Sequence, residues 1–356
     1  MKSFLVIFVS IVTTILGCTT VHIPLEDTLV VGRTMELGNG HDLLSRWELV
    51  AHDRGTVNSH PTLGANVHGF VSIDVMKNAE SAVSLTDGMN EKGLTVSVQT
   101  FRGAEYQDRK VVDFLHTVTS FELAKVLLGH TASVDEVSAL LPKLRVVGNK
   151  TPPQWRCHWA VQDSFGRSIV IEYIAGALTI HDNSEVGILT NDPNYSWHLA
   201  NLDQYAALSP SQPDASSWSA GSHPSAVGHG LNLLGVPGGF SPASRFVRCF
   251  VLKQHLSSSS PPSTADEAVA AVTGILNNVH ISKGMVPTLS SSEADASHEV
   301  THWSAIKMPG RREFWFRSYS DMTWRRVDVG GLEFGTGRVY ERVKVDDGVG
   351  VVDVHM

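Results

Sequence analysis

Alternating apolar and polar positions predict strands in the first third of the chain. Residues 19–24 and 29–35 are strand-like runs on either side of a polar turn at 25–28, which is the pattern of a β-hairpin. Further strand-like runs lie at residues 47–51, 70–75, 81–85 and 94–101, and the polar, glycine-containing residues 87–93 predict a turn before the last of them. This opening segment is therefore expected to be rich in β-structure.

The pattern then changes to helical spacing, returns to strands and changes again. Helices are predicted at residues 121–128 and from Ser133 to about residue 144, where Ser133 and Glu136 have the spacing of a capping box. Strands are predicted at 154–162, 168–174, 177–181 and 186–190, helices at 197–208, 242–256 and 265–278, and strands at 300–308, 313–318 and 323–329. Polar loops or linkers are expected at 209–226, 257–264 and 288–297. Segregated runs of this kind favour an α+β fold over a doubly wound parallel sheet.

A short apolar segment precedes these elements. Residues 4–16 are almost entirely apolar, Lys2 lies before them and the small residue Gly17 follows, which is the layout of a secretory signal peptide. The segment is too short to span a bilayer comfortably. We therefore expect residues 1–17 to be a signal peptide, residues 18–356 to form one domain, and the mature protein to be secreted or periplasmic with Cys18 as its first residue.

Composition and charge exclude some classes of partner. The 356 residues are 42% hydrophobic and 18% charged, with a formal net charge of −8, so no basic surface for nucleic acid is expected. The three cysteines, Cys18, Cys157 and Cys249, are an odd number for a secreted chain. A disulfide between Cys157 and Cys249 is one possibility, but their apolar neighbours favour two buried thiols.

Cys18 combines two groups that catalysis can use if it becomes the first residue. A thiol is a strong nucleophile once a base removes its proton, and a free α-amino group titrates near pH ~8, so it can be that base. Two other interpretations compete. Cys18 can be an ordinary buried thiol, or a lipidated cysteine, because residues 15–18 (ILGC) loosely resemble a bacterial lipoprotein cleavage box. Lipidation would consume the sulfur, so anchoring and this catalysis exclude each other.

One histidine pair matches a zinc-binding pattern. His298, Glu299 and His302 form an HExxH sequence, which binds zinc when both histidines share a helix face. Here the β-branched residues between them predict a strand, on which the two histidines would lie roughly 13 Å apart at ~3.3 Å per residue. We therefore expect no metal at this position.

Seven short motifs occur together in the remaining sequence. They are CTT at 18–20, GRTME at 32–36, DGMNEKGL at 87–94, HW at 158–159, LTNDP at 189–193, WHLANL at 197–202 and PASRF at 242–246. In this order they resemble the choloylglycine hydrolase and penicillin V acylase family of N-terminal-nucleophile hydrolases. The resemblance implies a four-layer αββα sandwich in which the nucleophile begins a central strand.

The resemblance also implies a role for each matching residue. Cys18 would be the nucleophile and its own α-amino group the base, with Arg33 beside the thiol. Glu36 stands where most members have aspartate and would orient the α-amino group. Asn191 would donate to the oxyanion, and Arg245 would complete the charged network on the far side of the nucleophile.

Thr100 departs from the family pattern. At this position bile-salt hydrolases usually carry asparagine and some penicillin acylases carry tyrosine, so either the oxyanion is held by Asn191 and a backbone N–H, or the site accepts another substrate. His158 and Trp159 are interpreted as core residues of a strand, and Asn90 as a structural turn residue.

The activity that the resemblance implies is hydrolysis of linear, non-peptide amides. Expected substrates are small molecules such as penicillin V, conjugated bile acids or other N-acyl amides and lactones. No metal or organic cofactor is implied, and the resemblance implies a homo-oligomer, since family members are often tetramers. The alternatives are a lipid-anchored protein or a catalytically inactive member that binds amphipathic ligands.

Overall fold

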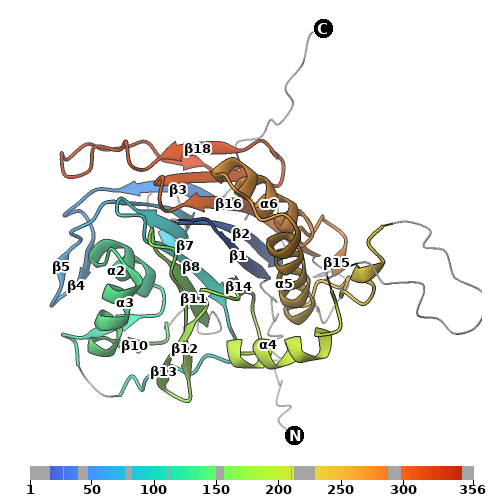
Figure 1. The fold of residues 1–356 in the computed structure, drawn as a ribbon. Coiled ribbons are helices and arrows are strands. Elements are labelled where there is room, and N and C mark those ends of the chain that lie inside the picture. Colours follow the sequence, from blue (N-terminus) through green and yellow to red (C-terminus); the bar gives the residue numbers. More distant parts are fainter. Residues whose placement is uncertain are drawn as a thin grey trace, which may run out of the picture.

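Two antiparallel β-sheets form the centre of the molecule, and helices cover their outer faces (Figure 1). The computed structural model describes residues 17–26, 28–38, 47–76, 82–110, 113–149, 156–209, 211, 229–287 and 298–346. The predicted leader at residues 4–16, most of the loop at 209–226 and the loop at 288–297 lie outside the described residues.

The first sheet contains the first two strands of the chain and β16 to β18 from its last third. Its order is β14 (Ile188–Leu189), β1 (Cys18–Pro24), β2 (Leu29–Gly38), β16 (His298–Met308), β17 (Glu313–Ser318) and β18 (Arg325–Asp328), with β15 (Val286–Pro287) beside β16. The predicted hairpin is confirmed as β1 and β2, in which Cys18 pairs with Met35 and Thr20 with Arg33.

The second sheet is formed mainly from the middle of the chain. Its order is β13 (Ala177–Asp182), β12 (Ser168–Ile174), β11 (Cys157–Gln162), β8 (Thr95–Thr100), β7 (Ala82–Asn90), β6 (Phe70–Met76), β3 (Trp47–His52) and β19 (Val343–Lys344). Two small ribbons, β4 (Asn58–His60) with β5 (Gly64–Ala65) and β9 (Thr117–Thr119) with β10 (Arg145–Val147), complete the strands.

Helices on both outer faces make the four layers. α6 (Ala265–Asn277) packs on β1 and β2, α5 (Pro242–Ser259) packs on β1 and β14, and α2 (Leu123–His130) packs on β7 and β8. α3 (Val134–Leu140) lies beside α2, and α4 (Tyr195–Leu202) contacts α5. The αββα sandwich predicted from the sequence is therefore confirmed. No helix in the described ranges is both long enough and apolar enough to cross a bilayer.

Each hydrophobic cluster contains one of the three cysteines. Cys157 lies in the cluster that includes α2, α3 and the second sheet, and Cys249 lies in the cluster that includes α5, α6 and the first sheet. Cys18 lies in the cluster between the two sheets. All three are buried and none forms a disulfide, so the interpretation of Cys157 and Cys249 as buried thiols is confirmed.

The alternation of β1 and β2 places their side chains on two different sides. Cys18 and Arg33 face the second sheet, whereas Val21 belongs to the cluster under the helices. Gly32 also faces the helices, where an added Cβ would lie 2.2 Å from a methyl group of Val272. A glycine is therefore needed there for the close approach of α6.

Several predicted boundaries are wrong, and three of them have a clear physical reason or consequence. Residues 87–90 are not a turn, because β7 continues to Asn90 and the Asp87 side chain is bonded inside the sandwich. α5 continues to Ser259, into the predicted linker, because the helical N–H···O=C bonds persist as far as Ser260 N–H to Leu256 O. α4 ends at Leu202 instead of reaching residue 208, and a 3₁₀ turn follows.

Candidate active site

Cys18 is the first residue of β1 and points into the space between the sheets. It is 1% exposed, and its Sγ lies 3.4 Å from Met35 Sδ on the neighbouring strand. In this structure the Cys18 nitrogen is still joined to Gly17, whose carbonyl accepts a hydrogen bond from Glu36 N–H at 2.8 Å. The strand ladder therefore continues one residue before the thiol.

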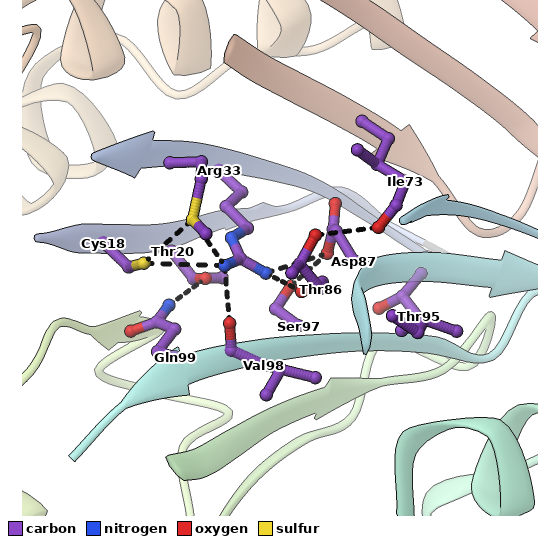
Figure 2. Close-up of polar contacts among 12 residues, drawn as sticks. Cys18, Thr20, Arg33, Ile73, Thr86, Asp87, Thr95, Ser97, Val98 and Gln99 are labelled. Carbon is purple, nitrogen blue, oxygen red and sulfur yellow. Dashed lines mark hydrogen bonds and ion pairs between the residues drawn. The ribbon is translucent and has the colours of Figure 1, made fainter. Parts of the chain in front are cut away.

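Arg33 brings a positive charge to the sulfur. Its Nη2 is 3.6 Å from Cys18 Sγ and donates to the carbonyl of Val98 at 2.5 Å, while Nη1 donates to the carbonyl of Thr86. Figure 2 shows the guanidinium extended between the two sheets, with the thiol at one end. The guanidinium also lies over the Trp303 ring, 5.2 Å from its centroid. The sequence-predicted pair of Cys18 and Arg33 is thus brought together.

Burial dominates the protonation of the thiol. Removal from water raises the pKa of Cys18, Glu36 raises it further, and the positive charges of Arg33 and Arg245 lower it only in part. A thiol with a raised pKa is protonated at neutral pH, so a base must remove its proton before it can attack a carbonyl carbon. A free α-amino group on Cys18 would supply such a base within the same residue.

Asn191 and Arg245 contact the backbone of Cys18. The Asn191 Oδ1 atom accepts from Cys18 N–H at 2.7 Å and from Arg245 Nη2 at 2.9 Å. Arg245 Nη1 donates to the Cys18 carbonyl at 2.6 Å and to Thr19 Oγ1 at 2.7 Å. The Asn191 amide nitrogen donates to Thr100, at 2.9 Å to its carbonyl and 3.0 Å to Oγ1. These contacts join Thr100 at the end of β8, Asn191 and helix α5 around Cys18.

His158 holds the segment that carries Asn191, a role that the sequence did not indicate. Its Nε2 donates to the Thr190 carbonyl at 2.8 Å and its Nδ1 faces Glu172 Oε1 at 3.0 Å. Hydrogen bonds, the one from His158 foremost, lower the pKa of Glu172 to about 2 against the opposing effect of burial. Glu172 is therefore an ionised acceptor beside His158. His198 adds a bond to the Asn191 carbonyl at 2.9 Å.

The pairing of His158 and Glu172 is visible only after the sheet order is known. They lie on the adjacent strands β11 and β12, 14 positions apart in the sequence. Each residue alone has the pattern of a buried strand position, so the interpretation of His158 as a core residue is confirmed but incomplete.

Two carboxyl groups enclose Gly17. Glu36 Oε1 accepts from Thr301 Oγ1 at 2.8 Å, and burial raises the pKa of Glu36 to about 7. Burial also raises the pKa of Glu299, whose Oε1 would lie 2.5 Å from a Cβ added at Gly17. Glu36 is therefore beside the residue that precedes Cys18, while the Cys18 nitrogen itself bonds to Asn191.

A small apolar pocket of about 30 Å³ lies beside the thiol. Its lining residues are Cys18, Met35, Leu37, Trp47, Ser84, Thr86, Val98, Gln99, Thr100, Phe121 and Cys157. This lining contains no Asp, Glu, Lys or Arg side chain, so it suits an uncharged, apolar group better than an ion.

The HExxH sequence lies on a strand, as predicted. His298 and His302 are both on β16, and His302 Nδ1 accepts from Trp47 Nε1 at 3.2 Å. Within the described ranges no group of three potential metal-ligating side chains comes together.

Comparisons with known proteins agree with this geometry. A family model described as linear amide C–N hydrolases, choloylglycine hydrolase family, matches residues 18–335 and so begins at Cys18. A bile salt hydrolase/transferase of Lactiplantibacillus plantarum is 34% identical over 266 residues, which are 74% of this chain and 78% of that protein. An uncharacterized protein of Paramecium bursaria Chlorella virus 1 is 31% identical over 316 residues, 87% of this chain and 100% of that protein.

Solved structures show the same fold. A mutant of the conjugated bile acid hydrolase from Clostridium perfringens superposes with a TM-score of 0.79 at 22% identity, covering 95% of this chain and 100% of that chain. The penicillin V acylase from Agrobacterium tumefaciens superposes with a TM-score of 0.71 at 19% identity, covering 94% of each chain.

Proposed function

The chain belongs to the choloylglycine hydrolase family of linear amide C–N hydrolases, and we propose that Cys18, freed at its amino end, is its nucleophile. The observation that carries this proposal is the arrangement around one residue. The sulfur lies against Arg33 and an apolar pocket, while the backbone nitrogen lies against Asn191. A thiol beside a guanidinium, a small apolar pocket and a hydrogen-bonding amide thus meet at the start of β1, and this arrangement supports the proposal.

The proposed reaction has two steps. The α-amine takes the proton of the Cys18 thiol, and the sulfur attacks the amide carbon. The C–N bond breaks as the leaving nitrogen receives that proton, which leaves a thioester on Cys18. Water, deprotonated by the same α-amine, then attacks the thioester, the C–S bond breaks, and the acid leaves as the sulfur regains a proton.

Asn191 would stabilise the oxyanion in both steps. Its amide nitrogen now donates to Thr100 Oγ1 and to the Thr100 carbonyl. Release of the N–H held by the hydroxyl would make one donor available while the carbonyl still orients the amide. Such a preorganised donor typically contributes roughly 10²–10³ in rate.

The pocket supports a substrate with an apolar acyl group and a small polar amine. Penicillin V, conjugated bile acids and other N-acyl amides or lactones all meet this description. Relatives of this chain are called bile salt hydrolase and, over a shorter stretch, penicillin V acylase. An uncharged lining beside the sulfur favours an acyl group without a charge near the scissile bond.

Activation and location are parts of the same proposal. Removal of residues 1–17 by signal peptidase would release the α-amine and export the enzyme to the periplasm or the medium. The apolar segment at residues 4–16 supports this. The absence of space for a side chain at Gly17, which lies between two carboxyl groups, agrees with the small residue expected before a cleavage site. A lipid-anchored protein is the alternative at this position.

The test uses the secreted protein and three variants. Purified wild type, Cys18→Ala, Cys18→Ser and Cys249→Ala are incubated with penicillin V, glycocholate, taurocholate and an N-acyl-homoserine lactone, and the released amine is quantified. We expect hydrolysis of at least one substrate by wild type and by Cys249→Ala, and none above background by Cys18→Ala. A folded Cys18→Ala protein with wild-type activity would refute the proposal.

The same assay separates the alternatives. A burst of amine equal to the enzyme concentration supports an acyl-enzyme. Binding of these substrates without any amine release would instead identify an inactive, ligand-binding member. Lipid on Cys18, detected by mass, would identify an anchor.

A further inference from the structure

A buried lysine extends the charged group beside the nucleophile. Lys307 lies on β16 and is completely buried between the sheets. Its Nζ donates to Asp87 Oδ1 and, at 2.8 Å, to Ser97 Oγ. Ser97 in turn donates to the same Asp87 oxygen at 2.7 Å. The lysine therefore has no route to solvent and makes its ion pair with one carboxylate.

Asp87 connects Lys307 to Arg33 and, through Arg33, to Cys18. Its Oδ1 is 3.7 Å from Arg33 Nη1, and the same guanidinium reaches Cys18 Sγ from its other nitrogen at 3.6 Å. Figure 2 shows Arg33 between Cys18 on one side and Asp87 with Ser97 on the other. Arg33, Asp87 and Lys307 are each 0% exposed.

The formal charges of this group do not balance until the sulfur is ionised. Arg33 and Lys307 contribute two positive charges and Asp87 contributes one negative charge. An uncompensated charge is expensive in the interior, where the effective dielectric constant is low. A thiolate on Cys18 supplies the missing negative charge.

We propose that Lys307 is a positioning residue for the Cys18 thiolate. Its ion pair with Asp87 neutralises that carboxylate and so leaves the positive charge of Arg33 available to the sulfur. This rests on the proposed role of Cys18 as nucleophile. Without Lys307, Asp87 would neutralise Arg33, and the thiolate would be the unbalanced charge.

The other charged and titratable groups around Cys18 and around Lys307 are consistent with this account. Glu36 and Arg245 act on Cys18 with opposite signs, and Cys157 lies close enough to interact with it. Around Lys307, Asp87 opposes the lowering of the lysine pKa that burial and Arg33 produce. None of these groups replaces the charge of Lys307 beside Asp87.

The test is the pH dependence of Cys18 alkylation in the processed protein. Iodoacetamide is applied at a series of pH values, and peptide mapping by mass spectrometry follows Cys18 alone. Cys157 and Cys249 stay silent through the range, since burial raises both of their pKa values to about 12. The assay needs no amide substrate, so it remains informative even if no hydrolysis is found.

The variants have predicted shifts of opposite sign. Lys307→Met moves the alkylation midpoint upward by about one pH unit or more, and Asp87→Asn moves it downward, because a nearby charge shifts a pKa by roughly 1–3 units. The double variant Asp87→Asn/Lys307→Met restores the original net charge and returns the midpoint to that of wild type. Ser97→Ala, which removes hydrogen bonds without a charge, is the matched control and shifts the midpoint little.

Two outcomes would overturn the proposal. One is an unchanged midpoint in folded Lys307→Met, and the other is a double variant whose midpoint stays as high as that of Lys307→Met. If Lys307→Met does not fold, the other two variants still decide the question. Asp87→Asn must lower the alkylation midpoint of Cys18, and the double variant must have the midpoint of wild type. Loss of amide hydrolysis in Cys18→Ala is a separate result and tests the nucleophile, not the lysine.

Discussion

The two sides of Cys18 are built in different ways. On the side between the sheets, Arg33 and Asp87 sit on strands β2 and β7 and act on the sulfur through charge. On the other side, Asn191 follows β14 and Arg245 lies on α5, and both contact the backbone nitrogen or carbonyl of Cys18. The first side determines whether the sulfur is ionised, and the second determines where the reacting atoms lie.

This difference indicates how the site divides its tasks. Ladder bonds and complete burial fix the strand-borne charges, so they cannot adapt to a new substrate without disturbing the sandwich. The residues on the second side belong to a loop and a helix, where change is better tolerated. Substitutions on the second side that conserve charge should therefore change rate or geometry without altering the titration of the thiol.

Asn191→Ala is expected to give the largest effect on the second side. Loss of one oxyanion donor should lower kcat by roughly 10²–10³, with little change in KM. The alkylation midpoint of Cys18 should stay near that of wild type, because no charge is removed. Asn201→Ala, on α4, is the control, and steady-state kinetics beside the alkylation assay make the measurement. A change in KM with kcat unchanged would contradict the assigned role.

Arg245→Lys is expected to have an intermediate effect. The guanidinium bonds the Cys18 carbonyl and Asn191 Oδ1 together, and a lysine cannot span both. A hydrogen bond to a charged group contributes about 1.5–3 kcal/mol, so kcat should fall roughly ten- to hundredfold. Arg248→Lys, one turn away on α5 and bonded to Pro237 and Gly239, should retain most of the activity.

Glu36→Gln tests the buried carboxyl group beside Gly17 through the pH dependence of the free energy of unfolding. Burial raises the pKa of Glu36 from its ordinary value of 4.5 to about 7, so the folded state holds a proton that the unfolded state has released. Stability should therefore decrease as pH rises from about 4.5 to 7. Glu36→Gln should remove this component, roughly 1–3 kcal/mol at the upper end.

Denaturant unfolding at pH 5 and pH 8 measures that effect in protein that retains Gly17, the state described here. Glu172→Gln provides the contrast, because the pKa of Glu172 is lowered to about 2 and its contribution is lost only at acidic pH. An equal pH slope in wild type and Glu36→Gln would show that Glu36 does not bind the extra proton.

Thr100→Val is expected to give the smallest effect. The variant removes the hydroxyl that accepts from Asn191, but the Thr100 carbonyl still accepts at 2.9 Å. We expect kcat to change by less than about tenfold, since a single neutral hydrogen bond contributes about 1 kcal/mol. A loss as large as that of Asn191→Ala would show that the hydroxyl itself is required.

Local sequence was sufficient for the elements and for the residues that share a motif. The family resemblance predicts that Cys18 and Arg33 lie together, and the hairpin register explains why they do, because Thr20 pairs with Arg33 and so Cys18 and Arg33 share one face. The turn predicted at residues 87–93 is wrong over 87–90, where β7 continues. Asp and Gly favour turns locally, but Asp87 is bonded to Ser97 on the neighbouring strand β8 and to Lys307 on β16 of the other sheet.

Long-range partners were the part that sequence could not supply. Lys307 is separated from Asp87 by 220 positions, and nothing in its local pattern distinguishes it from an ordinary strand residue. His158 and Glu172 became a pair only through the order of β11 and β12. Contacts of this kind depend on which strands meet, and that is set by the packing of the whole sandwich.

The most direct test of the account is the intact mass of the secreted enzyme, recorded alone and during turnover of its best substrate. We predict a chain that begins with unmodified Cys18 and, during turnover, a second species heavier by one acyl group, which peptide mapping places on Cys18. A mature chain that keeps Gly17 or carries lipid on Cys18, or an active enzyme that is acylated at another residue, would contradict the account.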